Sequence, residues 1–187
     1  PIRPIQQPHP HPPQMPTATP PPSSPIPTAI ITVSDRASRG EYEDLGGPAL
    51  AAACAQRGWT VAAEMLVPDD LARIQDAIRA VAAQGCGLIL TTGGTGITER
   101  DVTPEAIRGL MRVELPGFGE IMRARSMDIT PNAILSRSLA AVVDHSLVIA
   151  PPGKPSGAVE CLGFVAGAIP HAVKLAQRVF GDELRAR

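Results

Sequence analysis

The sequence lacks several features that would place the protein in a well-known class. Its three cysteines are an odd set without C-x-x-C spacing, which argues against a disulfide framework or a zinc site and favours buried free thiols. No stretch approaches the roughly 18 apolar residues of a membrane-spanning helix, and the N-terminus has no signal pattern. We therefore expect a soluble, cytoplasmic protein without a membrane partner.

An excess of charge is also missing. The 187 residues carry a formal net charge of −1, whereas a broad nucleic-acid footprint needs clustered Lys and Arg that release counterions. We expect no nucleic-acid partner, so any anionic ligand must be bound by a local group of residues. The two common nucleotide fingerprints, G-x-x-x-x-G-K-[ST] and G-x-G-x-x-G, are absent as well.

Proline divides the chain into two parts. Residues 1–27 contain twelve of the 21 prolines and few aliphatic side chains, so they cannot bury enough surface to fold. We expect this segment to be an extended, disordered tail. Residues 28–187 have the length and composition of a single domain with its own core.

From residue 28 onward, short β-branched or apolar runs alternate with amphipathic segments. This alternation predicts a three-layer α/β/α sandwich with a mostly parallel central sheet. The predicted strands are 29–33, 59–67, 86–90, 139–143 and 146–150, and the predicted helices are 48–57, 71–84, 104–111, 116–127 and a helical region that includes 159–173.

The segment 91–105 contains the strongest functional signal. Glycines expose the backbone, so phosphate oxygens can approach converging N–H groups, and the threonines add hydroxyl donors. The segment follows a predicted buried strand, and Thr103-Pro104 predicts the next helix, with Thr103 as its N-cap. It predicts a phosphate cradle, although similar turns also serve as plain connections. The residues of the cradle are Thr92, Gly93, Gly94, Thr95 and Gly96.

An acidic residue follows this cradle. A carboxylate at Asp101 would repel a phosphate unless a divalent cation stood between them, which points to Mg²⁺. The alternative is that Asp101 only caps the next helix. Asp69, after the second predicted strand, has the same alternative, and its neighbour Asp70 could act as the cap instead.

The parallel arrangement has a geometric consequence for these residues. In an open α/β sheet, ligands bind at the carboxyl ends of the strands. Ser34-Asp35, Asp69, the glycine-rich turn and the loop Pro152-Gly153-Lys154-Pro155-Ser156 all follow predicted strands. We therefore expect these polar segments to line one cleft.

Five blocks of sequence, in order along residues 28–180, carry a family resemblance. They are Thr32-Val33-Ser34-Asp35-Arg36, the glycine-rich turn with Arg100-Asp101-Val102-Thr103-Pro104, Pro116-Gly117-Phe118-Gly119-Glu120, Ala133-Ile134-Leu135-Ser136-Arg137, and Pro152-Gly153-x-Pro155. The series resembles the molybdopterin adenylyltransferase (MogA/MoaB-type) family of molybdenum cofactor biosynthesis.

This resemblance implies a cytosolic, Mg²⁺-dependent enzyme that transfers an adenylyl group from ATP to the terminal phosphate of molybdopterin. It also implies a homotrimer and a hand-over of the product to a molybdenum-insertion protein. The resemblance places the catalytic, metal-binding acids at Asp69 and Asp101. The substrate-binding residues would be Ser34, Asp35, Thr92, Gly93, Gly94, Thr95, Gly96, Pro152 and Gly153, to which position and charge add Lys154 and Ser156.

The last loop departs from the family pattern. The family commonly reads L-P-G-x-P-K there, whereas this chain has Pro151 in place of the leucine and Ser156 in place of the lysine. Two other functions stay open from the residues alone. The domain could be a non-catalytic carrier of molybdopterin on the same scaffold, or an interaction scaffold recruited through its Pro-rich tail.

Overall fold

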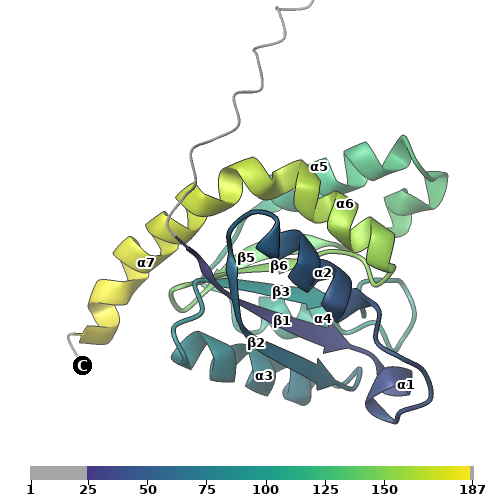
Figure 1. Ribbon diagram of the computed structural model, residues 1–187, viewed down its shortest axis with the longest axis horizontal. Helices are drawn as coiled ribbons and strands as arrows, with labels where there is room; N and C mark the ends of the chain where they lie inside the picture. The colour runs from purple at the N-terminus through teal and green to yellow at the C-terminus, as the bar shows by residue number, and fades with distance from the viewer. Residues whose placement is uncertain (1–24, 186–187) are drawn as a thin grey trace, which may run out of the picture.

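A twisted sheet of six strands lies between two layers of helices in the computed structural model, which describes residues 25–185 (Figure 1). In chain order, the elements are β1 (Pro27–Val33), α1 (Asp35–Ser38), α2 (Gly46–Ala55), β2 (Thr60–Val67), α3 (Leu71–Ala83), β3 (Leu88–Thr92), α4 (Thr103–Arg108), β4 (Val113–Glu114), α5 (Pro116–Met127), the 3₁₀ turn η1 (Pro131–Leu135), β5 (Leu139–Val143), β6 (Ser146–Ala150), α6 (Pro155–Val165), the 3₁₀ turn η2 (Ala166–Ala168) and α7 (Ile169–Arg185).

The strand order in the sheet is β2-β1-β3-β6-β5-β4. The strands β2, β1, β3 and β6 pair with one another in parallel, while β5 pairs antiparallel with both β6 and β4. The predicted mostly parallel sheet is thereby confirmed. The strands β1, β3, β5 and β6 are nearly fully buried, as expected for strands that are covered on both faces.

The two faces of the sheet form two separate hydrophobic cores. One core packs α2, α5, α6 and α7 against the sheet, with Leu50, Met122 and Leu162 among its buried side chains. The opposite core packs α3 and α4, with Ile74 and Ile107. Figure 1 shows the same division, with α3 below the sheet and α2, α5 and α6 above it. The predicted three-layer arrangement is therefore confirmed.

The last helices form one long helical region. Its segment Pro155–Val179 has 25 residues and is long and apolar enough to cross a membrane by length and composition, with 33% of its most apolar window buried inside the protein. Core helices of soluble proteins meet the same test. Within this segment, Cys161, Val165 and Ile169 are buried against the sheet, whereas Leu175 and Val179 are exposed.

Some local elements differ from those predicted from the sequence. Residues 1–24 of the predicted tail lie outside the described residues, but Ile26 is only 6% exposed and Pro27 opens β1, so the packed domain begins before residue 28. Residues after Ser34, predicted as a loop, begin with the short helix α1. Neither β4 nor η1 was predicted, because each is too short to show a periodic pattern.

The predicted buried thiols are confirmed, since Cys54, Cys86 and Cys161 are all free and buried. Burial raises the pKa of the Cys54 thiol to about 11. One buried polar atom is less well accommodated: among the described residues, the hydroxyl of Thr91 has no hydrogen-bond partner. An unpaired hydroxyl in a core costs free energy, because its hydrogen bonds to water are lost.

We predict that Thr91→Val, which removes this hydroxyl with little change of shape, raises the free energy of unfolding by about 1 kcal/mol. The matched control is Thr28→Val in the neighbouring strand, where the hydroxyl donates to the Ile26 carbonyl at 3.0 Å. That variant should lose about 1 kcal/mol. Urea unfolding followed by circular dichroism measures both, and equal destabilisation by the two substitutions would contradict the prediction.

Candidate functional site

The parallel register brings four strand ends to one edge of the sheet. Val33 pairs with Val67, and Thr32 pairs with Thr92, so β1, β2 and β3 end at the same level. Leu90 pairs with Ile149, so β6 ends beside β3. The four polar segments that follow these strands therefore lie next to one another, as the sequence predicted.

The glycine-rich turn depends on backbone conformations that favour glycine. Gly93 and Gly94 have φ angles of +101° and +63°. A Cβ at Gly93 would collide with the carbonyl oxygen of Val33, and one at Gly94 would collide with the hydroxyl of Thr103. The turn thus packs its bare backbone directly against the end of β1 and the start of α4.

Thr103 fastens this turn rather than capping its own helix. Its hydroxyl donates to the Gly93 carbonyl at 2.9 Å, and its N–H donates to the Gly94 carbonyl at 3.1 Å. It is the first residue of α4, and Val102 is the N-cap without a side-chain hydrogen bond. The prediction that Thr103 is the N-cap was therefore wrong, because the N-cap lies one residue earlier at Val102 and Thr103 already belongs to the helix.

The loop after β6 contacts the same turn. The hydroxyl of Thr92 donates to the Pro152 carbonyl at 3.2 Å. A Cβ at Gly153 would lie 3.1 Å from the Cα of Gly93, so the two loops approach each other backbone to backbone. Larger side chains at either glycine would separate the loops.

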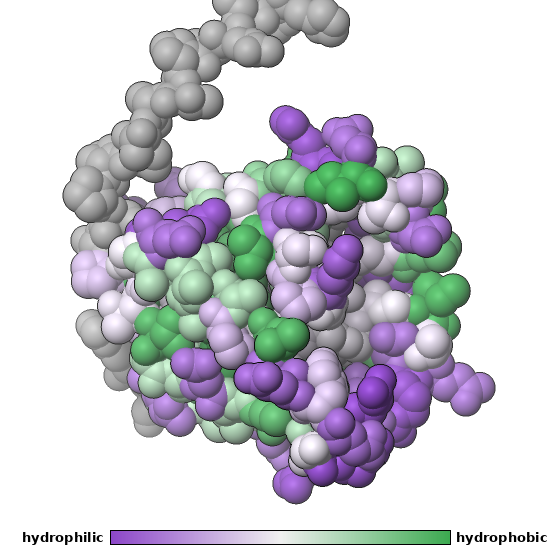
Figure 2. Space-filling view, turned by 45° about the vertical axis from the view of Figure 1, so that its right-hand side comes forward, coloured by the Kyte–Doolittle hydropathy of each residue, from purple (hydrophilic) through white to green (hydrophobic). Residues whose placement is uncertain are grey.

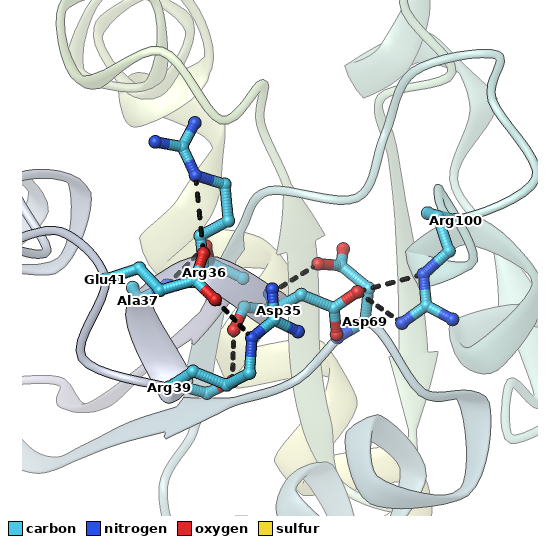
Figure 3. A network of polar contacts seen from close by, with 9 residues as sticks. Asp35, Arg36, Ala37, Arg39, Glu41, Asp69 and Arg100 are labelled. Atoms are coloured by element: carbon cyan, nitrogen blue, oxygen red, sulfur yellow. Dashed lines mark hydrogen bonds and ion pairs between the residues drawn. The ribbon is translucent and has the colours of Figure 1, made fainter.

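The two aspartates that follow β1 and β2 bind each other's backbone. The N–H of Asp35 donates to Oδ2 of Asp69 at 2.7 Å, and the N–H of Asp69 donates to Oδ1 of Asp35 at 3.1 Å. Arg100 donates two hydrogen bonds to the other oxygen of Asp35, one of them from Nε at 2.9 Å. Figure 3 shows Arg100 and Asp69 on one side of Asp35, with Arg36, Arg39 and Glu41 on the other.

The helix-cap alternative for Asp69 is removed by its neighbour. Asp70 is the N-cap of α3, and its side chain accepts from the N–H of Arg73 at 3.0 Å. Asp69 is free of that task and turns toward the glycine-rich turn, where a Cβ at Gly94 would lie 3.2 Å from its Oδ1. This oxygen accepts no hydrogen bond from the described residues, so it remains available for a ligand.

The pKa values of Asp69 and Asp35 are shifted in opposite directions. Burial raises the pKa of Asp69, and the negative charges of Asp35 and Asp101 add to this effect. Desolvation also acts on Asp35, but hydrogen bonds from Arg100 and from the Asp69 N–H outweigh it and lower the pKa of Asp35. An incoming positive charge near Asp69 would relieve this repulsion.

Asp101 closes the turn from its far end. Its Oδ2 accepts from the hydroxyl of Thr98 at 2.6 Å and from the N–H of Thr98 at 2.9 Å. Burial raises its pKa, but these hydrogen bonds, together with one from the Gly96 N–H, lower it below the ordinary value. Asp101 is thus an ionised carboxylate that both shapes the turn and faces the charge of Asp69.

Arg137 is a residue of this site that our sequence reasoning missed. It donates from its N–H to the Thr95 carbonyl at 2.9 Å and from Nε to the Gly96 carbonyl at 2.6 Å. Its guanidinium also contacts the Asp101 carbonyl and the Glu105 carboxylate. The block Ala133–Arg137 was part of the family resemblance, but nothing in the local sequence indicates that this arginine holds a turn about forty residues earlier.

A cavity of about 570 Å³ opens on the other side of the turn, between it, the Pro152 loop, α5, α6 and the segment around η1. This volume is within the range of small-molecule sites. Six predicted substrate-binding residues line the cavity: Thr95, Gly96, Pro152, Gly153, Lys154 and Ser156. The polar residues of the cavity that sequence reasoning missed are Arg123, Ser126, Thr130, Asn132, Ser136, Ser138 and Glu160.

The remaining predicted residues lie at the acidic end, outside this cavity, so the expectation that all four segments line one cleft was wrong, although they lie at the same edge of the sheet. Ser34 is the N-cap of α1, and its hydroxyl accepts a hydrogen bond from the N–H of Ala37. Asp35 pairs with Asp69, while Thr92, Gly93 and Gly94 connect the acids to the loops described above. On the face in Figure 2, where the side of the molecule bearing α1 comes forward, hydrophilic residues gather at the lower right.

The residues present suit a magnesium ion that is shared with a substrate. Within the described part of the chain, no group of three or more His, Cys, Asp or Glu residues could hold a metal ion. Mg²⁺, however, is commonly bound through one or two carboxylates together with substrate phosphates and water. The free oxygen of Asp69 and the ionised Asp101 fit this second arrangement.

Comparison with known proteins agrees with this fold and site. The model of a family described as a probable molybdopterin binding domain matches residues 29–171. A crystal structure of the molybdopterin biosynthesis enzyme MoaB from Thermus thermophilus is 43% identical, covers 81% of this chain and 96% of that chain, and superposes with a TM-score of 0.76. The chain therefore belongs to the molybdopterin-binding domain family.

Individual relatives have more specific names. The molybdopterin adenylyltransferase of Helicobacter pylori strain J99 is 41% identical over 155 residues, which cover 78% of this chain and 85% of that protein. The molybdenum cofactor biosynthesis bifunctional protein of Synechococcus elongatus is 40% identical over 146 residues, which cover 78% of this chain and 46% of that protein.

We predict that Arg137→Lys loosens the turn without unfolding the domain, because one ammonium group cannot reach both the Gly96 and Asp101 carbonyls. Amide hydrogen exchange in residues 96–101 should accelerate at least about tenfold, as expected for the loss of a charge-assisted hydrogen bond. Arg79→Lys, in an exposed ion pair on α3, is the control. Unchanged exchange in the turn would mean that Arg137 does not hold it.

We also predict opposite pH dependences for two neighbouring aspartates in the absence of divalent cations. The pKa of Asp69 is raised above its ordinary value of 3.8, so the protonated side chain stabilises the fold relative to the ionised one. This contribution to the free energy of unfolding is complete below pH 3.8 and is lost as the pH rises through the pKa of the folded state. Asp69→Asn should therefore gain stability relative to the parent between about pH 3 and 7. Asp35→Asn should lose stability over the same range, since the lowered pKa of Asp35 stabilises the fold at higher pH.

Urea unfolding at several pH values measures both differences. Parallel trends for the two variants would contradict the charge arrangement described above.

Proposed function

We propose that this protein is a molybdopterin adenylyltransferase, which joins the adenylyl group of ATP to the terminal phosphate of molybdopterin and releases pyrophosphate. The observation that carries the proposal is the placement of Asp69 beside Gly94 and of Asp101 beside Gly96, both on the acidic side of the glycine-rich turn. The name of the relative from Helicobacter pylori supports the same activity. Mg²⁺, ATP and molybdopterin are the cofactor and the two substrates in this proposal.

The chemistry requires two anionic groups to approach each other. The terminal phosphate of molybdopterin is already largely ionised at neutral pH, so its oxygen can attack the α-phosphorus of ATP without a strong base. The main tasks of the protein are then to position the two phosphates and to offset their repulsion. A bound Mg²⁺ would supply positive charge between the phosphate oxygens.

The residues of the chain divide these tasks. The free oxygen of Asp69 and the carboxylate of Asp101 would hold the magnesium ion beside the turn. The backbone of Gly93, Gly94 and Gly96 lets phosphate oxygens approach without side chains between them. Lys154, which lines the cavity and is exposed, adds a positive charge in the loop where Ser156 replaces the lysine of the family pattern.

Further parts of the proposal concern assembly and location. We infer a homotrimer in the cytoplasm that hands its product to a molybdenum-insertion protein. The bifunctional relative from Synechococcus elongatus supports the hand-over, because the match covers 46% of that protein and leaves room for a second part.

A carrier function is the second candidate. The cavity of about 570 Å³ could bind molybdopterin without transferring an adenylyl group to it. The two functions differ in what the acids are needed for, since a carrier has no use for a magnesium site between two phosphates.

We predict that Asp101→Asn and Asp69→Asn keep the fold but lower the rate of adenylyl transfer at least about a hundredfold, because each removes a charge that acts in the transition state. The assay mixes protein, molybdopterin, Mg²⁺ and ATP and measures pyrophosphate and adenylyl-molybdopterin. Asp76→Asn, on the exposed side of α3, is the matched control and should retain the parent rate.

Parent-like rates in both active-site variants would rule out the metal-carboxylate mechanism. Binding of molybdopterin by the unmodified protein without any pyrophosphate release would select the carrier function instead.

A further inference from the structure

The cavity beside the glycine-rich turn has a single acidic wall residue. Among the described residues that line it, Glu160 is the only Asp or Glu. It lies on α6, four residues after Ser156, and both side chains line the cavity. Residues four apart share one face of a helix, and the rise between them is about 6 Å. Glu160 therefore stands about one helical turn along α6 from Ser156.

Glu160 has no partner within the described part of the chain. It is partly buried, yet it makes no hydrogen bond or ion pair there. A carboxylate offers about four acceptor positions and no donor. A ligand that brings two N–H groups can fill two of these positions with charge-assisted hydrogen bonds.

The two substrates of the proposed reaction differ in the groups that they offer to a carboxylate. The pterin ring presents its 2-amino group and N3–H side by side, which is a pair of donors. Adenine presents its 6-amino donor beside a ring nitrogen that is an acceptor. A carboxylate can accept two parallel hydrogen bonds from the pterin edge, whereas against adenine one oxygen would face a lone pair.

We propose that Glu160 is the specificity-determining residue of the cavity and accepts hydrogen bonds from the 2-amino group and N3–H of the pterin ring. This inference rests on the proposed function for the identity of the ligand. The phosphate end of molybdopterin would then lie toward Thr95, Gly96 and Lys154, which line the same cavity. ATP is left to the acidic side of the turn, beside Asp69 and Asp101.

The arrangement of the cavity wall agrees with an aromatic ring held at its edge. Ile129 and Leu135 supply exposed apolar surface for a flat ring, while Ser126 lies near Glu160 through its contact with the neighbouring Cys161 at 3.5 Å. The ring is thus bound by apolar contact, and its orientation is set by the carboxylate.

The test compares two ring probes, 6-hydroxymethylpterin and 6-hydroxymethyl-lumazine, which carries an oxygen in place of the 2-amino group. Dissociation constants come from ligand fluorescence with the full-length protein. The parent should bind the pterin about ten- to a hundredfold more tightly than the lumazine, as expected for charge-assisted hydrogen bonds. Glu160→Gln should lose or reverse this preference, because its amide donor matches the lumazine oxygen.

The control variant is Glu120→Gln, an exposed glutamate on α5 that lines no cavity described above. It should keep the parent preference. If Glu160 had only a structural role, Glu160→Gln would weaken the binding of both probes equally. An unchanged preference for the pterin over the lumazine in this variant would therefore overturn the inference. Failure of the parent protein to bind the pterin probe would overturn it as well.

Adenylyl transfer by the parent protein is measured separately. Pterin selectivity that depends on Glu160 in a protein without transfer activity would support the inference and contradict the proposed enzyme. If the parent protein transfers adenylyl groups but Glu160→Gln leaves the preference for the pterin probe unchanged, the proposed enzyme is supported and the inference about Glu160 is contradicted.

Discussion

The parallel pairing of β1 with β2 and β3 is the constraint on which the site depends. It ends three strands at one level, so the N–H groups of Asp35 and Asp69 can each meet the other's carboxylate. The same pairing puts the Val33 carbonyl against Gly93, where only a glycine fits. A shift of one residue along β1 would break these contacts together, because side chains would also exchange faces of the sheet.

The charges of the site are balanced locally, as the small net charge of the chain requires. Asp35 is neutralised by Arg100, and the carbonyls of the turn are held by Arg137. Among the described residues, no arginine donates a hydrogen bond to Asp69, and burial together with nearby acids raises its pKa. This is the pattern expected of a functional site, where a group is left unsatisfied in the free protein so that a ligand can satisfy it.

Much of the fold follows from the sequence because its signals are local. Buried β-branched strands, amphipathic helices and left-handed glycines act within a few residues, so the strands 139–143 and 146–150 were predicted with their observed bounds. Asp69 and Asp101 were singled out by the family resemblance, while the residues alone also allowed both to be helix caps. Arg137 and Glu160 could not be singled out, since their contacts depend on which distant segments meet after folding. The hydroxyl of Thr103 shows the same limit, because it donates to the Gly93 carbonyl only once the turn has folded.

The glycine-rich turn therefore separates two environments with different chemistry. On one side, Asp69 and Asp101 provide negative charge that suits a cation and its phosphates. On the other side, a cavity with apolar walls and one unpaired carboxylate suits a flat ring with N–H donors. The glycines of the turn leave few side chains between these two environments. The two substrates of the proposed reaction can then be selected separately and still meet at the backbone of Gly93 to Gly96.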